Sequence, residues 1–139
     1  MTCHWRGVQF WSWRNCSVAA LPLAAHHSFA AEFDATKKVS LQGTMTKLDW
    51  MNPHIWMYLD VKDDSGTVAH WQCEGAPPNT LTRNGWTKDS LKVGDQVTIE
   101  GVRSKDGTNT CNARSVKLPS GKSVFAGSAE DGGPKGPAQ

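Results

Sequence analysis

Two adjacent histidines near the start of the chain could bind a metal ion. His26 and His27 follow a short apolar stretch that ends at Ala25. If an export signal is removed after Ala25, the new α-amine and the imidazole of His26 can chelate one ion together, and His54 can add a third nitrogen. Cleavage one residue earlier instead combines the amine, backbone amides and the His27 imidazole. Such nitrogen donors suit Cu(II), so the sequence predicts a site for Cu(II) or another late transition metal at His26, His27 and His54.

Each of these histidines also has a simpler interpretation. His26 and His27 would form a solvated, frayed terminus if nothing folds over them. His54 follows Pro53 in a turn, where a polar side chain commonly bonds its own backbone. The spacing does not establish that His54 meets the N-terminal pair, so both interpretations stay open.

A second candidate site is a row of polar and aromatic side chains on two neighbouring strands. Apolar and other residues alternate over residues 55–62 and again over 67–74, which is the period of a half-buried strand. The alternation places five side chains away from the core: Trp56, Tyr58, His70, Gln72 and Glu74. Exposed aromatic rings can stack on a sugar, a base or another planar group, so we expect a ligand-binding or protein-binding face here. Alternatively, the N-terminal segment covers this face through Phe29 and Phe33.

The sequence offers little for catalysis. The carboxylates of Asp49, Asp60 and Glu74 stand apart, and no partner is fixed by their spacing. We find no Gly-x-Ser-x-Gly, no His-Glu-x-x-His and no glycine-rich phosphate loop. Ser28 is too close to His27 in the chain to form a catalytic triad. A non-catalytic binding protein is therefore expected rather than an enzyme.

The charge distribution argues against a nucleic acid as the partner. Arg6 and Arg14 account for the formal net charge of +2, so the chain after them is neutral overall. Phosphate neutralisation supplies most non-specific affinity for nucleic acids, and a neutral body lacks the basic field that this requires. Arg83, Arg103 and Arg114 could still hold an anion, although solvated or structural roles are the simpler interpretation. No run of about eighteen apolar residues is present, so no ordinary transmembrane helix is predicted.

Residues 1–25 resemble an export signal of unusual composition. Arg6 and Arg14 precede the apolar stretch, which ends in small residues, and this is the usual order of positive region, apolar region and cleavage site. The tryptophan-rich start and Pro22 are unusual in such a signal. The alternatives are an incorrect start residue or an ordinary N-terminal extension, which would leave the protein in the cytoplasm. We expect a periplasmic protein whose partner is another periplasmic protein or a small ligand.

Export would remove two of the four cysteines with the leader. Removal of residues 1–25 leaves Cys73 and Cys111, in an oxidising compartment. The two cysteines either form a disulfide or remain as two buried thiols. No Cys-x-x-Cys pair is present, so neither a thioredoxin-like motif nor a zinc ribbon is predicted.

Five strands and a helical insert are expected to position these residues. The first strand covers residues 39–50, and its apolar phase slips next to Gly43, which predicts a bulge or a sharp bend. The second and third strands are the alternating segments described above, joined by a turn at 63–66. The fourth strand directs Val97 and Ile99 inward. The fifth runs from about residue 110 to 118, and a last short strand at 123–125 is an option.

The order of these elements predicts the fold. Short helical turns capped by Asn79 and Thr87 lie between the third and fourth strands. This is the order of an all-β, five-stranded OB-fold-like Greek-key barrel with a short helical insert between strands 3 and 4. The expected domain covers residues 26–125, followed by a disordered tail over 126–139. In such a barrel the third and fifth strands are neighbours, which would bring Cys73 and Cys111 close together. A small β-sandwich is the runner-up.

Several short motifs occur together in this chain. They are His26-His27-Ser28-Phe29, Trp50-x-Asn52-Pro53-His54 and Leu91-Lys92-x-Gly94-Asp95, with further matching stretches at 79–87 and 112–116. In combination they resemble a family of short exported bacterial proteins of unknown function, whose mature chain opens with His-His-Ser-Phe. The resemblance covers about residues 26–127 and implies export and a small β-barrel, but no established activity. The leader, Cys73 and Cys111 depart from the usual pattern of that family.

Overall fold

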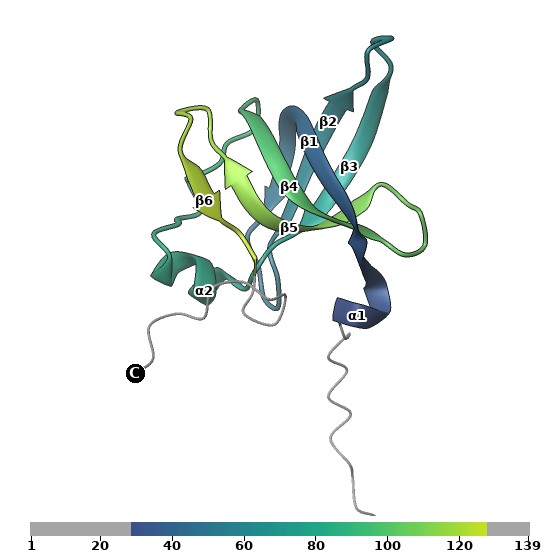
Figure 1. Cartoon of the computed structure of the whole chain (residues 1–139). Helices are drawn as coiled ribbons and strands as arrows, with labels where there is room; N and C mark the ends of the chain where they lie inside the picture. Colours follow the sequence, from purple (N-terminus) through teal and green to yellow (C-terminus); the bar gives the residue numbers. More distant parts are fainter. Residues whose placement is uncertain (1–28, 128–139) are drawn as a thin grey trace, which may run out of the picture.

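Six strands and two short helices make up the part of the chain that the structure, a computed structural model, describes, residues 29–127 (Figure 1). The elements are α1 (Phe29–Glu32), β1 (Phe33–Asp49), β2 (Trp56–Lys62), β3 (Val68–Glu74), α2 (Pro78–Arg83), β4 (Gln96–Ser104), β5 (Thr110–Lys117) and β6 (Ser123–Phe125). Neither helix has the length and apolar character needed to cross a membrane. The expected export signal, His26, His27 and residues 128–139 lie outside the described residues.

The six strands form one sheet that closes on itself. Neighbours follow the order β3-β2-β1-β4-β5-β6, and all of these pairs are antiparallel. A short parallel pairing between β3 and β5 completes a ring, with Cys73 opposite Cys111. The all-β expectation is therefore confirmed, as is the position of the helix α2 between β3 and β4. The strand count differs from the expected five because the optional segment at 123–125 pairs with β5 as β6.

The strand β1 bends so that it can belong to both halves of the ring. Its middle part pairs with β4, from Lys38 to Thr44, and its last part pairs with β2, from Thr44 to Asp49. The register with β2 shifts between residues 45 and 47, which is the bulge that the phase slip predicts. Gly43 lies just before the bend, where a β-carbon would lie only 2.5 Å from the backbone oxygen of Asp60. The missing side chain therefore allows β2 to lie directly against β1.

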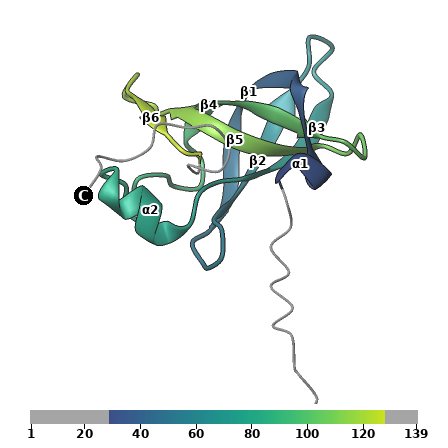
Figure 2. The same ribbon diagram turned by 60° about the horizontal axis from the view of Figure 1, so that its bottom comes forward.

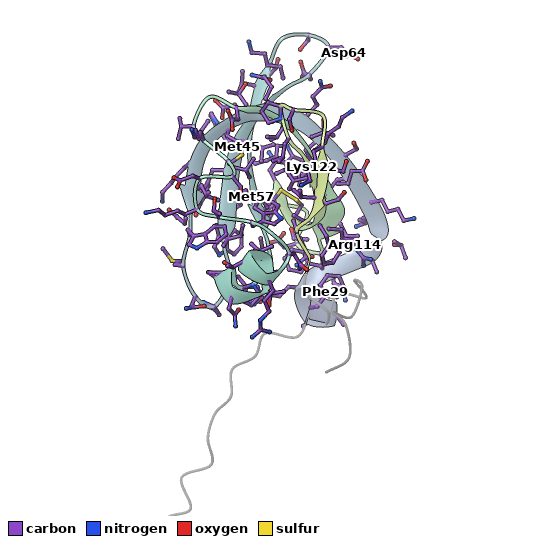
Figure 3. The ribbon with its side chains drawn as sticks, turned by 90° about the vertical axis from the view of Figure 1, so that its left-hand side faces the viewer. Phe29, Met45, Met57, Asp64, Arg114 and Lys122 are labelled. Atoms are coloured by element: carbon purple, nitrogen blue, oxygen red, sulfur yellow. A yellow bond between two sulfur atoms is a disulfide. The ribbon has the colours of Figure 1, made fainter. Side chains whose placement is uncertain are left out.

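The inside of the ring is filled with apolar side chains. Met45 and Met57 point inward, and the disulfide is seen among them (Figure 3). The largest fully buried side chains come from several strands and from the α2 region: Trp86, Met45, Ile55, Met57, Leu59, Leu81, Ile99, Val102 and Val116. The indole of Trp86 donates a hydrogen bond to the carbonyl of Phe125, 3.0 Å away, which ties the segment after α2 to β6. Ala126 follows β6, is fully buried, and accepts a backbone hydrogen bond from Ala76.

The helical regions differ from the expectation in detail. The helix α2 begins at Pro78 after Pro77, without a side-chain cap, and Asn79 lies inside it. Proline is favoured at the first helical position because its fixed φ suits the helix and its missing N–H needs no partner there. The segment after Thr87 forms a hydrogen-bonded turn with Ser90 and not a helix. The helix α1 was not among the predicted elements, because four residues are too few to show a helical period.

Substitution of Gly43 by alanine tests the bend in β1. We expect the free energy of unfolding to fall by about 1–3 kcal/mol, because the added β-carbon must push apart the backbones of β1 and β2. Urea denaturation followed by tryptophan fluorescence measures the change. The control is Gln42→Ala at the neighbouring exposed position, which should change stability by less than about 0.5 kcal/mol. Equal stability of the Gly43→Ala and Gln42→Ala variants would show that the approach of β1 and β2 at residue 43 does not require glycine.

The Cys73–Cys111 disulfide forms, which settles the alternative left open by the sequence. It closes a loop between residues that are 38 positions apart, with the two Cα atoms at 4.5 Å. From this loop length we expect reduction to lower the free energy of unfolding by about 4 kcal/mol. Denaturation curves of oxidised protein and of fully reduced protein, verified by mass, measure the difference. The double variant Cys73→Ala/Cys111→Ala serves as the control and should not respond to reductant. Coincident curves for both redox states of the wild type would contradict the expectation.

Candidate functional site

His54 lies in the connection between β1 and β2 and is held by a hydrogen bond to another segment. Its neighbour Ile55 is fully buried, which anchors the connection in the core. Nδ1 of His54 lies 2.9 Å from the carbonyl oxygen of Gly75 and 3.4 Å from Oε1 of Glu74. Because a carbonyl can only accept, we assign the proton to Nδ1, which leaves a lone pair on Nε2. The interpretation of His54 as a turn residue that bonds its own backbone is therefore wrong, since the ring reaches across to the end of β3.

The pairing of β3 with β5 sorts side chains onto the two sides of the ring. Cys73 and Cys111 form the disulfide on the inner side. Glu74 and Asn112 are the next register pair, and by the alternation of strands they face outward. Asn112 is only 4% exposed, and its Oδ1 has no hydrogen-bond partner within the described part of the chain. Glu74 thus lies beside the His54 imidazole and has the buried Asn112 as its register partner on β5.

The structure does not place the N-terminal histidines that the sequence grouped with His54. His26 and His27 precede the first described residue, Phe29. Within residues 29–127, no three His, Cys, Asp or Glu side chains stand close enough together to hold a metal. Phe29 begins α1, which lies at the lower end of the molecule in Figure 1, where β2 also begins; Figure 2 turns that end forward. The described chain therefore starts beside the turn after β4, where Lys105 donates to the carbonyl of Glu32.

The predicted outer face of β2 and β3 forms in register. Trp56 lies opposite Glu74, Tyr58 opposite Gln72, and the fifth predicted residue, His70, is opposite Asp60. Tyr58, His70 and Gln72 line a groove of about 240 Å³ together with the loop between β4 and β5. The loop contributes Thr108 and Asn109, and β5 contributes its first residue, Thr110, whose hydroxyl accepts a hydrogen bond from the Gln72 amide over 3.1 Å. Trp56 and Glu74 lie at the other end of the strand pair, beside His54.

Cations and carboxylates already occupy part of this face. Nζ of Lys47 lies 5.0 Å from the centre of the Tyr58 ring and 2.7 Å from Oδ2 of Asp49. The hydrogen bond to Asp49 raises the pKa of Lys47, so the ammonium stays charged above the ring. His70 is 84% exposed and lies 2.6 Å from the Asp60 carboxylate. A ligand that stacks on Tyr58 must therefore share the ring with Lys47 or displace it.

The loop that forms the other wall of the groove is held by its own hydrogen bonds. The Asp106 carboxylate accepts hydrogen bonds from the Ser104 hydroxyl and from the backbone and hydroxyl of Thr108. These bonds, that from Ser104 most of all, hold the pKa of Asp106 below its usual value. Arg103 donates to the backbone oxygens of Thr108 and Gly107, and its guanidinium lies 5.2 Å from the Trp71 ring. Arg103 therefore has the structural role that the sequence analysis treated as the simpler interpretation.

The N-terminal phenylalanines pack near this loop. The rings of Phe29 and Phe33 stack with their centres 5.6 Å apart, and Phe33 is buried. The backbone N–H of Lys105 donates to the carbonyl of Glu32, which ties α1 to the turn after β4. Tyr58 remains half-buried, so it is neither fully covered nor fully free.

Comparison with known proteins places the chain in a family. Residues 15–113 match the model of a family described as "Family of unknown function (DUF6152)". The chain belongs to this family. The matched range includes His54, Glu74 and both disulfide cysteines, and it ends within β5, ahead of β6. Searches of the curated proteins and of the solved structures each found no similar chain. The resemblance to a family of unknown function is confirmed, while export stays a prediction.

Proposed function

We propose that this protein binds Cu(II) or another late transition metal outside the cytoplasm, without catalysing a reaction. The observation that carries the proposal is the hydrogen bond from Nδ1 of His54 to the carbonyl of Gly75. Metal-binding histidines typically donate one ring N–H to a carbonyl or carboxylate, which fixes the tautomer and the orientation of the ring. His54 is oriented in this way and its side chain is still 33% exposed. Its Nε2 is therefore suited to be a metal ligand.

The donors near His54 fit such a metal in kind but not in number. The Nε2 of His54 is a nitrogen ligand that suits Cu(II), whereas the Glu74 carboxylate lies beside Nδ1, on the donating side of the ring, where it helps to orient the imidazole. No group of three acidic, histidine or cysteine side chains is available for this purpose within residues 29–127. We therefore propose that His26 and His27 complete the ligand set. The support for this assignment is that the two histidines are paired at the start of the expected mature chain.

The proposal includes export and a specific fold. A disulfide is typical of proteins in oxidising compartments, and this supports removal of the leader in the periplasm. The ring of β1 to β5, closed by β3 and β5 with α2 inserted before β4, supports an OB-like Greek-key barrel. In this proposal the partner is a periplasmic protein or a small ligand that receives or supplies the metal.

Copper titration of the protein recovered from the periplasm tests the metal site. We expect one retained Cu(II) per chain, and at least tenfold weaker affinity in His54→Ala and in His26→Ala, since each variant removes a nitrogen ligand. Intact mass gives the stoichiometry and the N-terminus, and electron paramagnetic resonance reports the nitrogen ligands. The matched control is His70→Ala, which removes an exposed, carboxylate-paired histidine from the other end of β3. Wild-type affinity in both His54→Ala and His26→Ala would overturn the proposal.

The groove between the outer face of β2 and β3 and the β4–β5 loop favours a second candidate function. We propose that it binds one ring of a neutral sugar or a similar planar polar group. It combines an aromatic ring, Tyr58, with amide and hydroxyl groups from Gln72 and Thr110, and this mixture is typical of small-ligand sites. In OB-folds the same face and the same loop form the ligand-binding surface, which supports the proposal by analogy. The neutral body favours a sugar over an oligonucleotide.

Two opposite substitutions test this groove. We expect Tyr58→Ala to weaken sugar binding by about tenfold, because the stacking surface is lost. Lys47→Ala should strengthen binding, because the ammonium no longer competes for the ring. Nuclear magnetic resonance titration with glucose and maltose measures both effects, with Lys62→Ala, an exposed cation further along β2, as the control. Equal shifts for all three variants would show that the sugars do not use this groove.

A further inference from the structure

A larger groove lies on a different part of the ring, between β1, β4 and β5. It has a volume of about 480 Å³, within the range of small-molecule sites. The lining side chains combine apolar residues with charged ones: Ala35, Lys38, Val39, Ser40, Glu100, Gly101, Val102 and Arg114. This groove shares no residue with the groove beside Tyr58 or with the surroundings of His54. It is therefore a separate site.

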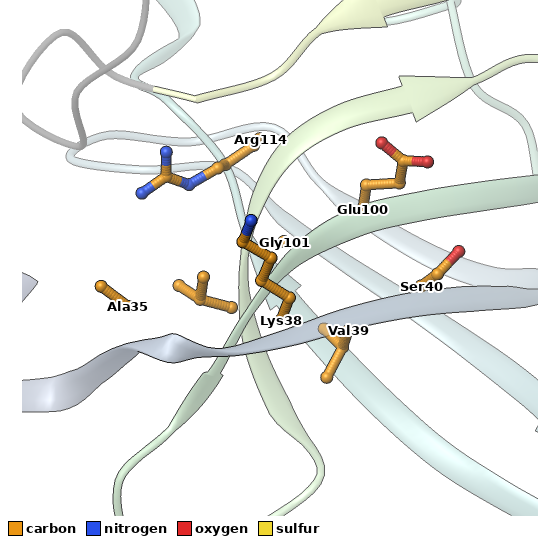
Figure 4. A pocket seen from close by; sticks show the side chains of 8 residues that line it. Ala35, Lys38, Val39, Ser40, Glu100, Gly101 and Arg114 are labelled. Carbon is orange, nitrogen blue, oxygen red and sulfur yellow. The ribbon is translucent and has the colours of Figure 1, made fainter.

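Arg114 reaches this groove because β5 carries a bulge. The register between β4 and β5 passes from Glu100–Ser115 to Gly101–Ala113, so that Arg114 has no partner on β4. A bulge re-aims the side chain of the extra residue. A β-carbon on Gly101 would lie 2.1 Å from the backbone oxygen of Asn112, so only glycine allows β4 and β5 to approach in this way. The local backbone thus directs the guanidinium of Arg114 into the groove (Figure 4).

The groove contains two cations, Lys38 and Arg114, and one carboxylate, Glu100. Figure 4 shows the ammonium of Lys38, from β1, and the guanidinium of Arg114, from β5, reaching into the same space. Neither side chain forms an ion pair within residues 29–127, and Nε of Arg114 is buried there without a hydrogen-bond partner. The carboxylate of Glu100 lies on the other side of the groove and accepts a hydrogen bond from the Ser115 hydroxyl. Nε of Arg114 therefore lacks the acceptor that a buried donor requires.

We propose that this groove binds a small organic anion, namely a carboxylate with an apolar body. Two oxygens of a carboxylate match the paired N–H groups of a guanidinium, and Lys38 adds a second positive charge. Ala35 and Val102 line the groove on the same side as the cations and give it an apolar wall. The carboxylate of such a ligand pairs with the two cations, and its apolar body covers the apolar wall. An inorganic anion would pair only with the cations.

Binding of decanoate to the full chain as recovered from cells tests the proposal. We expect saturable binding by isothermal titration calorimetry, which weakens as salt is added because the contact is ionic. Lys38→Gln and Arg114→Gln should each weaken the affinity by about tenfold, the usual cost of losing a hydrogen bond to a charged group. Lys62→Gln and Arg83→Gln, at exposed positions away from the groove, are the matched controls and should bind like the wild type. Decanol, which lacks the charge, should bind at least tenfold more weakly.

Several outcomes would overturn the proposal. Absence of saturation with decanoate would do so, and so would wild-type affinity in both Lys38→Gln and Arg114→Gln. Inorganic phosphate binding as tightly as decanoate would show that the apolar wall has no role. Tighter binding of a short peptide through its C-terminal carboxylate would show that the groove recognises the C-terminus of a protein and not a small molecule. Because Lys38 is exposed, its substitution leaves the fold intact even if Arg114→Gln perturbs the bulge, and thermal unfolding of both variants checks this.

Discussion

The close approach of β1 and β2 at Gly43 is the contact on which the ring depends. β1 pairs with β4 before this point and with β2 after it, so the two halves of the sheet are joined through one strand. With a β-carbon at residue 43 only 2.5 Å from the Asp60 oxygen, the strands would have to separate. Separation would also move β3, since β3 is held to β2 along its whole length. The positions of His54, Tyr58 and their neighbours follow from this single bend.

The closing contact between β3 and β5 is short, and the disulfide supplements it covalently. Its three register pairs place the cysteines inside, while Glu74 and Gln72 face outward with their partners on β5. Gln72 and Glu74, two of the candidate binding residues, are therefore the direct chain neighbours of the disulfide-bonded Cys73. A rigid support of this kind favours binding, because the ligand does not have to order the side chains that contact it.

Methionines, the disulfide and Trp86 pack together in the interior of the ring. The candidate sites lie on the outside of the ring. The surroundings of His54 and Glu74 combine an oriented imidazole with a carboxylate. The groove beside Tyr58 is polar and aromatic, and the groove beside Arg114 is cationic and apolar. These different chemical characters suggest different ligands. One small fold can present all three because they lie at different parts of the ring: the end of β3, the face of β2 and β3 beside the β4–β5 loop, and the strands β1, β4 and β5.

Local patterns in the sequence were sufficient to identify most of the strands and the faces of β2 and β3. Alternation identified β2 and β3 and the outward direction of Tyr58 and Gln72, and the phase slip identified the bend near Gly43. These features depend on neighbours in the chain, whose side chains must alternate in any strand. The start of α2 at Pro78 and the existence of α1 were missed, because short helices carry no period.

Contacts between distant segments were decided only by the tertiary structure. The β4–β5 loop joins Tyr58 in a groove because the parallel pairing of β3 with β5 brings Thr110 beside Gln72. Lys47 covers the Tyr58 ring because β1 and β2 are in a particular register, and the amino-acid pattern is the same for other registers. Arg114 was visible in the sequence only as one arginine among several. Its role depends on a bulge and on Lys38, 76 positions earlier in the printed sequence. The sequence by itself thus determined which residues face outward, and the closure of the ring decided which of them meet.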